Sequence, residues 1–526
     1  MKLRFFLLII ILVISASETF AQENAASSIR KDASVRDMKY LSSDELQGRG
    51  TGSAGNDAAA AYISTKAQEA GLKPLPGQKD LFQTLKYLKI KPIADSSFIT
   101  VTDTTGAVIV KSHVTPVMSP NDRVSFSGDV VFAGYGFMNS VLKYNDFQGL
   151  TIKDKIVLIM TREPDLEGTG LPNPGDAISE SVETRKLPFL IFLQPKAIVY
   201  VTDPALPSED GIGVLPVSSS YQLVPLFKNP MFNIALNIYT VSRETAEKML
   251  ASSGHTLAEL QNIISVTKKP ASFQLSNTKA SVLVGVEKDT VTSNNVAGYL
   301  EGSDPVLKEE CVIYTAHYDH MGVTPSGVVM NGANDNASGT VGLLNVARAF
   351  GSLEKKPLRS VVFLWTTGEE VGLHGSSYYV ENPLFPLDKT VADINFDMIA
   401  RSRMKTDSGK SLTGNIDITG NDTIKIVSAR DCEILLQDAK SSCLHFGLYP
   451  IDEGKGEHFS GSDHYPFYRK GIPAVFFFTG LHKDYHQATD DFEFIDFEKL
   501  LKVSKAGFLT GIKIANTTER PVITKK

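Results

Sequence analysis

The sequence predicts an α/β protein with a buried central sheet, and two observations carry that prediction. From about residue 280, short apolar runs such as CVIYTAH, SVVFLWTT and PAVFFFTG alternate with segments of helical periodicity. Strands that are apolar on both sides indicate a sheet covered by helices on both faces. Carboxylate and imidazole side chains follow these runs repeatedly, and ligands of such sheets bind at the carboxyl ends of the strands.

The N-terminal segment predicts an export signal. MKLR supplies positive charge, the apolar run FFLLIIILVI follows, and small residues then offer a cleavage site after Ala21. The apolar run is too short to cross a bilayer. We therefore expect residues 1–21 to be a signal peptide and the mature protein to be periplasmic or secreted, with no stable membrane anchor.

Composition excludes several classes of protein. Hydrophobic residues make up 42% and charged residues 21% of the 526, which is typical of a globular protein, and a length of 526 favours two or three domains. The net charge of -6 gives no basic surface for nucleic acid. With three cysteines and no CxxC, a thiolate zinc site is not supported. Cys311 is expected to be a buried thiol, and a Cys432–Cys443 disulfide is left open.

The chain divides into segments by pattern. Residues 22–124 predict a helix, a Gly-rich loop, a second helix from Asn56 to Gly71, and short strands. Residues 125–275 predict a compact unit of strands and helices that holds no catalytic cluster. Residues 276–518 carry the alternating strands and helices, and residues 519–526 form a tail.

Candidate metal ligands fall at successive strand ends of this last large segment. They are His317 and Asp319 after CVIYTA, Asp335 in NGANDNASGT, Glu369 and Glu370 after SVVFLWTT, Asp397 in INFD, and His486 in KDYHQATDD. Nitrogen and carboxylate ligands without thiolates suit a catalytic zinc site. Two histidines and three carboxylates exceed the needs of one zinc ion and fit two.

Each of these patterns alone has an ordinary structural explanation. An HxD pair places two side chains on one face of a strand, an Asp in a Gly/Asn loop is usually a turn residue, and paired glutamates favour the first turn of a helix. Adjacent carboxylates such as Glu369 and Glu370 nevertheless repel each other unless a cation or proton lies between them. The joint occurrence at successive strand ends therefore favours a metal site.

The order and wording of the motifs resemble the co-catalytic two-zinc aminopeptidases, a family that also includes glutamate carboxypeptidase and the glutaminyl cyclases. The motifs are AHYDHMG, NGANDNASGTVGLLNVAR, FLWTTGEEVGLHGSSYYV, INFDMIARS and SDHYPFYRKGIPAVFFFTGLHKDYHQATDD. The resemblance covers residues 281 to about 515 and extends to YLSSDELQGRGTGSAG. It implies a three-layer α/β zinc-peptidase domain with a mixed central sheet. VVFAGYGF and LTIKDKIVLIM resemble an inserted, mainly-β protease-associated domain, which implies that identity for residues 125–275.

The resemblance also implies a role for each candidate residue, with two Zn²⁺ per chain. His317 and Asp397 would bind one zinc ion, Glu370 and His486 the other, and Asp335 both. Glu369 would be the general base that takes a proton from the shared water. Asp319 would hydrogen-bond the distal nitrogen of His317. The peptide bond after Asp335 would be cis.

The expected function is that of an exported zinc aminopeptidase that removes N-terminal residues from peptides. A carboxypeptidase or dipeptidase-like relative stays open, with Arg401 and Arg403 as candidates for a basic pocket. A non-catalytic peptide-binding protein and a cyclase are further alternatives, against which the complete ligand set speaks. Asp463, His464 and Tyr485 either shape the substrate pocket or simply pack. The side-chain preference, the oligomeric state and the role of the inserted domain stay open.

Overall fold

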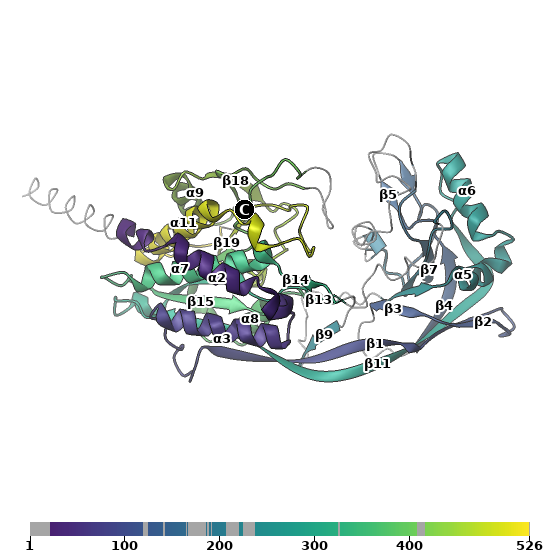
Figure 1. Ribbon diagram of the computed structural model, residues 1–526, viewed down its shortest axis with the longest axis horizontal. Coiled ribbons are helices and arrows are strands. Elements are labelled where there is room, and N and C mark those ends of the chain that lie inside the picture. Colours follow the sequence, from purple (N-terminus) through teal and green to yellow (C-terminus); the bar gives the residue numbers. More distant parts are fainter. Residues whose placement is uncertain are drawn as a thin grey trace, which may run out of the picture. The chain divides into compact units, whose positions relative to one another are not determined.

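The computed structural model in Figure 1 describes most of the chain. The described residues are 22–118, 125–139, 143–164, 166, 186, 189–190, 192–206, 220–224, 237–324, 327–407 and 416–524. The predicted signal peptide lies outside them. Among the helices of the described residues, none combines the length and apolar character that a membrane span requires.

The described residues form two compact units that share two long strands. One unit comprises residues 22–86, 292–407 and 416–524, and the other lies within residues 87–291. The chain passes between them along β1 (Phe82–Thr102) and returns along β11 (Phe273–Leu300). The second unit, which lies within residues 87–291, therefore extends beyond the predicted segment 125–275 on both sides. The identity of that segment as a protease-associated domain stays a prediction.

The first unit is built on a mixed sheet, as the family resemblance implied. Its strand order is β18-β17-β19-β16-β12-β15-β11. Apart from β11, these are β12 (Cys311–His317), β15 (Ser360–Thr366), β16 (Thr390–Phe396), β17 (Thr423–Ser428), β18 (Tyr449–Gly454) and β19 (Ala474–Phe478). The four central strands are parallel, whereas β17 runs antiparallel to β19 and β11 antiparallel to β15. The parallel strands therefore end at one edge of the sheet.

Helices cover both faces of this sheet (Figure 1). The main ones are α2 (Lys31–Leu41), α3 (Ala54–Glu69), α7 (Gly339–Gly351), α8 (His374–Glu381), α9 (Glu433–His445), α10 (His464–Arg469) and α11 (Phe497–Asn516). Val312 and Tyr314 of β12 join the large core that contains residues of α2, α3, α7 and α11. Ile313 points to the other face and joins the core that contains residues of α8 and α10. Helix, sheet and helix thus form three layers.

Short elements complete the first unit. They are η1 (Asp44–Arg49), η4 (Leu307–Glu309), η5 (Ala333–Ser338), η6 (Leu387–Lys389), η7 (Phe492–Phe494), and a hairpin of β13 (Gly322–Val323) and β14 (Val329–Met330). Helix α3 begins two residues before the predicted Asn56, because the Ser53 side chain caps it by accepting the Asn56 N–H. Gly71, just beyond its end, has φ +87°.

The three cysteines are free thiols. Cys432 occupies the position just before helix α9, and Cys443 lies eleven residues further along, within that helix. That spacing corresponds to roughly 16 Å along a helix axis, well beyond the reach of a disulfide. Burial raises the pKa of Cys311 and of Cys443 to about 12, so both thiols are unreactive at neutral pH.

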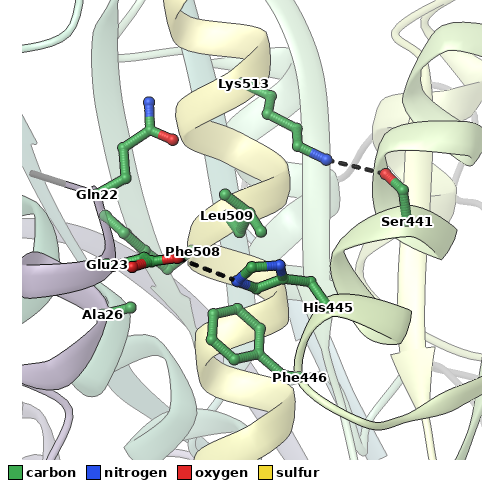
Figure 2. Close-up of a pocket in the computed structure, with 9 residues that line it drawn as sticks. All are labelled: Gln22, Glu23, Ala26, Ser441, His445, Phe446, Phe508, Leu509 and Lys513. Atoms are coloured by element: carbon green, nitrogen blue, oxygen red, sulfur yellow. Dashed lines mark hydrogen bonds and ion pairs between the residues drawn. The ribbon is translucent and has the colours of Figure 1, made fainter. Parts of the chain in front are cut away.

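A cavity of about 240 Å³ lies between the N-terminal helical segment, α9 and α11. Figure 2 shows its lining: Gln22, Glu23, Ala26, Ser441, His445, Phe446, Phe508, Leu509 and Lys513. Lys513 donates to Ser441 across one side, and His445 faces Glu23 across the other. None of the predicted metal ligands lines this cavity.

The second unit also combines a mixed sheet with helices. Its strand order from β11 is β11-β4-β7-β8-β10-β3, with β1 pairing to β2 and β9. The bounds are β2 (Val108–His113), β3 (Thr115–Met118), β4 (Ser125–Phe132), β7 (Ile156–Met160), β8 (Ala197–Val201), β9 (Ser220–Leu223) and β10 (Ile238–Val241). Strands β5 (Met138–Asn139) and β6 (Tyr144–Asn145) form a small hairpin, and α5 (Arg243–Leu250), η3 (Ala251–Ser253) and α6 (Leu257–Thr267) complete the unit.

A buried carboxylate in the second unit organises the loop after β4. Asp146 accepts hydrogen bonds from the N–H groups of Tyr135 and Phe137, both at 3.0 Å, and from the Tyr144 hydroxyl at 2.9 Å. Burial nevertheless outweighs these bonds and raises the pKa of Asp146 from 3.8 to about 6. The folded unit therefore binds this proton more tightly than the unfolded chain does.

From the raised pKa of Asp146 we predict how the stability of the second unit depends on pH. Because the folded pKa lies above the unfolded one, stability from this group is complete below pH 4 and falls as the pH rises through 6, by roughly 3 kcal/mol. Asp146→Asn keeps an acceptor for both N–H groups and should flatten the dependence. Hydrogen exchange of β7 and β8 amides at pH 4.5 and 7, corrected for intrinsic rates, measures it. Asp154→Asn, an exposed carboxylate, is the control and should leave the dependence unchanged.

Candidate metal centre

The predicted ligands converge at the carboxyl edge of the central sheet. His317 ends β12, Asp397 follows β16, and Glu370 lies just beyond β15. The parallel pairing of β12 with β15 and β16 brings these ends together. Asp335 comes from η5 and His486 from the loop after β19. Five distant segments thus meet because their strands end at one edge.

The ligand atoms form two groups that share Asp335. In the first group, His317 Nε2 lies 3.2 Å from Asp397 Oδ1 and 3.5 Å from Asp335 Oδ1. In the second, His486 Nε2 lies 3.1 Å from Asp335 Oδ2 and 3.2 Å from Glu370 Oε2. Asp335 therefore turns one carboxylate oxygen toward each group, which is the arrangement expected of a bridging ligand.

These distances and the unsatisfied atoms fit a pair of zinc ions. Two ligands of a tetrahedral zinc ion lie about 3.3 Å apart, close to the separations in both groups. His317 Nε2, Asp335 Oδ2, Asp397 Oδ1 and His486 Nε2 are buried and have no hydrogen-bond partner. Buried polar atoms are rarely left unpaired, so these atoms point to a cation between them.

The electrostatics show how strongly the carboxylates need positive charge. Burial acts to lower the pKa of His317, but Asp397, Glu369 and Asp335 outweigh it and raise that pKa well above its ordinary value. For Glu370, burial acts to raise the pKa, yet His486 and His320 hold it well below its usual range.

Glu369 differs from its neighbour Glu370. Burial, together with the charges of Glu370 and Asp397, raises its pKa well above the ordinary value, against the opposing charge of His317. Its carboxylate lies within 4.8 Å of ligand atoms of His317 and Glu370, and both glutamates keep a partly exposed surface. Adjacent groups whose environments push their pKa values apart are typical of an acid–base residue beside a ligand.

The loop that carries Asp335 is fixed by hydrogen bonds from both sides. The Asp335–Asn336 peptide bond is cis, as the resemblance implied. Asp490 accepts the N–H groups of Asn334, at 3.0 Å, and Asp335, at 2.9 Å. Asn336 donates to the Phe396 carbonyl and accepts the Gly339 and Met398 N–H groups, which ties the loop to β16 and α7.

Asp319 makes different contacts from those predicted. His317 Nδ1 lies 3.2 Å from the backbone carbonyl of Asp319 and 3.9 Å from its carboxylate, so the carbonyl accepts the bond that fixes the imidazole. The Asp319 carboxylate instead accepts the Glu369 N–H at 3.2 Å and the Thr51 hydroxyl at 3.0 Å. Asp319 thereby positions the backbone of the predicted base.

Asp463 and His464 are fully buried near the centre, whereas Tyr485 is partly buried. Asp463 accepts a hydrogen bond from Thr366, the last residue of β15. His464 is fully buried and packs against Phe476 with ring centroids 5.0 Å apart. The ring of Tyr485 stacks on His486 at 3.9 Å. Tyr485 thus supports a ligand directly, whereas His464 packs in the core.

His320 contacts two of the predicted ligands, and the sequence analysis did not include it. Its Nδ1 lies 2.7 Å from Glu370 Oε1 and 3.7 Å from Asp335 Oδ2. Gly332 packs against this ring, since a Cβ at that position would lie 2.3 Å from His320 Cδ2. The motif HYDH contained the signal, because His320 follows His317 by three residues at the same strand end. By donating to Oε1, His320 leaves Oε2 of Glu370 to face His486.

We predict that His320→Ala weakens the binding of one of two zinc ions by about tenfold, because Glu370 loses the bond that orients it. His320→Asn keeps an N–H donor near the Nδ1 position and should recover most of the affinity. Zinc titration against a chromophoric chelator measures both constants. His445→Ala, a half-exposed histidine elsewhere, is the control. Equal weakening by the Ala and Asn variants would contradict the orienting role.

Comparison with known proteins identifies the catalytic unit. Residues 295–508 match the sequence model of peptidase family M28. This segment is an M28 peptidase domain. Aminopeptidase YwaD of Bacillus subtilis is 27% identical over 244 residues, which cover 45% of this chain and 48% of that protein. The match thus spans about half the length of this curated relative.

Solved structures resemble the chain beyond the M28 domain. An aminopeptidase from Aneurinibacillus sp. strain AM-1 has a TM-score of 0.54 and 18% identity, covering 96% of this chain and 98% of its own. BSAP, a zinc aminopeptidase from Bacillus subtilis, has a TM-score of 0.51 and 17% identity, covering 95% and 98%. At these identities, the likeness shows a shared mixed α/β fold.

Proposed function

We propose that this protein is an exported aminopeptidase that uses two zinc ions to remove N-terminal residues from peptides. The observation that carries the proposal is the pair of ligand groups that share Asp335, with Glu369 beside them, in an M28 domain. Zinc is supported by the ligand chemistry and by the similarity to BSAP, a zinc aminopeptidase. The similarity to aminopeptidase YwaD supports the reaction.

The residues divide the work between holding metal and moving a proton. His317, Asp397, Asp335, Glu370 and His486 would hold two zinc ions, which when bound supply Lewis acidity toward a water and a scissile carbonyl. Glu369 accepts the proton of the attacking water and donates it to the leaving amine, as a general base and then a general acid. Asp319, through its bond to the Glu369 N–H, holds that carboxylate in place.

One of the two arginines that kept the carboxypeptidase alternative open is not available to a substrate. Arg401 is fully buried, forms an ion pair with Asp484, and stacks over the Phe494 ring at 4.7 Å. Its guanidinium is therefore committed to the protein interior and is not offered to a substrate carboxylate. Arg403 donates its Nε to the Ile418 carbonyl at 2.9 Å. The concentration of carboxylates at the site instead suits the ammonium group of a free peptide N-terminus.

Hydrolysis of aminoacyl chromogenic substrates with free amines, beside the same substrates N-acetylated, tests the proposal. We expect cleavage of the free-amine substrates only, loss of cleavage after chelation, and recovery with zinc. Preferred cleavage of N-blocked peptides at their C-terminus would move the assignment to a carboxypeptidase. Folded, zinc-loaded protein without activity on any peptide would favour a binding protein or a cyclase.

A further inference from the structure

A row of buried polar side chains lies beneath the first ligand group. Side chains alternate along a strand, so Asp393 and Asn395 lie on the same face of β16. Asp397, the residue just after the strand, continues this alternation. Thr315 of β12 pairs with Asn395, and Ser462 comes from the loop before α10. Asp393, Thr315, Asn395 and Ser462 are all 0% exposed. A strand face covered by helices is normally apolar, so four polar residues here require an explanation.

These side chains connect by hydrogen-bond distances into one chain. Asp393 Oδ1 lies 3.0 Å from Thr315 Oγ1, which lies 2.9 Å from Asn395 Oδ1. Asn395 Nδ2 donates to Ser462 Oγ at 2.8 Å, and the Ser462 hydroxyl donates to Asp397 Oδ2 at 2.8 Å. The chain thus runs from a carboxyl group in the interior to a predicted metal ligand.

Counting hydrogens along the chain fixes its direction. Ser462 uses its one hydrogen on Asp397, so its oxygen accepts from Asn395 Nδ2. The amide oxygen of Asn395 then needs a donor, which only the Thr315 hydroxyl provides among these contacts. With that hydrogen used, the contact between Thr315 and Asp393 requires a hydrogen on Asp393. Every link is satisfied only when Asp393 carries a proton.

The surroundings of Asp393 also disfavour its ionised form. Its second oxygen, Oδ2, is buried without a hydrogen-bond partner, and no ion pair to it is found among the described residues. The neighbouring titratable group is another acid, Asp463. Burial, with Asp463 adding to it, raises the pKa of Asp393 well above the ordinary value, although the contacts with Thr315 and with the Ile394 backbone oppose this. An unpaired carboxylate here would be strongly destabilising.

We propose that Asp393 is a neutral carboxylic acid that begins a hydrogen-bond chain through Thr315, Asn395 and Ser462 and so orients the metal ligand Asp397. Holding Oδ2 of Asp397 with Ser462 leaves Oδ1 to face His317 Nε2. Asp393 is thus a positioning residue, and it never touches substrate. The inference rests on the proposed function only in taking Asp397 to be a zinc ligand.

Infrared difference spectroscopy tests the protonation directly. Wild-type protein at pH 7 should show the C=O stretching band of a protonated carboxyl group that shifts in D₂O and is missing in Asp393→Asn. The band should persist in Thr510→Val, which removes a buried hydroxyl bonded only within α11. Superimposable carboxyl regions in wild type and Asp393→Asn would overturn the proposal, because they would mean that Asp393 is ionised.

Zinc titration tests the positioning role. Asp393→Asn supplies an N–H donor to Thr315, so both zinc affinities should stay within about threefold of wild type. Thr315→Val, nearly isosteric, interrupts the chain and should weaken one zinc site by about tenfold, as should Ser462→Ala. Thr510→Val controls for loss of a buried hydroxyl. Unchanged zinc affinity in Thr315→Val, or a weakening as large in Asp393→Asn, would overturn the role.

Failure of this inference is distinguishable from failure of the proposed function. The infrared band and the zinc constants need no peptide turnover. A protein that binds two zinc ions but cleaves no peptide would contradict the aminopeptidase proposal. The infrared and zinc measurements would still decide whether the hydrogen-bond chain exists. If the Thr315→Val variant cleaves peptides normally and binds zinc with unchanged affinity, the aminopeptidase proposal stands. The proposed role of the hydrogen-bond chain is then overturned.

Discussion

Replacement of Glu369 by Gln is expected to lower kcat by about 10³-fold, or about 4 kcal/mol in transition-state stabilisation, with zinc content unchanged. Gln has the same shape but accepts no proton from the attacking water. Asp397 pairs with His317 and Glu370 pairs with His486, as metal ligands of one group would. Glu369 makes no such ion pair with either histidine. The expected signature is therefore loss of chemistry without loss of metal.

The measurement combines kcat on a free-amine substrate with metal analysis of the same sample. Glu381→Gln, an exposed glutamate of α8 that pairs with Lys470, should behave as wild type and serves as the matched control. Loss of a zinc ion in Glu369→Gln would assign Glu369 to the ligand set. Activity within tenfold of wild type would remove it from proton transfer.

Replacement of Asp335 by Asn is expected to weaken both zinc sites together, by at least about a hundredfold. One of its oxygens faces His317 and the other faces His486, so a single substitution withdraws charge from both groups. Asp397→Asn and Glu370→Gln each touch one group and should weaken mainly one zinc ion. A shared ligand is the only arrangement that gives this asymmetry among the three variants.

Native mass spectrometry over a zinc titration resolves the one-zinc and two-zinc forms of each variant. Thermal unfolding adds a second readout, since bound zinc stabilises the folded state and a variant that cannot bind it loses the concentration dependence of Tm. Retention of one zinc at wild-type affinity in Asp335→Asn would show that Asp335 serves a single site. Asp304→Asn, at a partly exposed carboxylate that accepts the Leu307 N–H and lies outside both ligand groups, is the control.

The central sheet and the ligand set could be predicted because short local sequence patterns indicate both. CVIYTAH, SVVFLWTT and PAVFFFTG coincide with β12, β15 and β19, and strand polarity then places their following residues at one edge. The alternation of apolar runs with helices needs no knowledge of distant contacts. The same logic placed Glu369 and Glu370 beside His317 before any coordinates.

What escaped prediction depends on contacts between distant segments. Asp490 braces the loop of Asp335 from 155 residues away, and no pattern near either residue indicates it. His320 stands in the same motif as His317, but only the packing of Gly332 and Glu370 turns it toward the site. The long strands β1 and β11 alternate buried and exposed positions over part of their length, but a run of exposed residues interrupts each of them, so no continuous period crosses the expected boundaries.

The order of segments in the chain also has a consequence for biosynthesis. Arg49, near the N-terminus of the catalytic unit, donates to the carbonyls of Tyr318, Asn331 and Gly332, about 270 to 280 residues later. The second unit is synthesised between these partners, and His486 comes later still. A growing chain can therefore complete the second unit while the catalytic one still lacks most of its sheet. The five predicted ligands are therefore all present only near the end of synthesis, once His486 has been added.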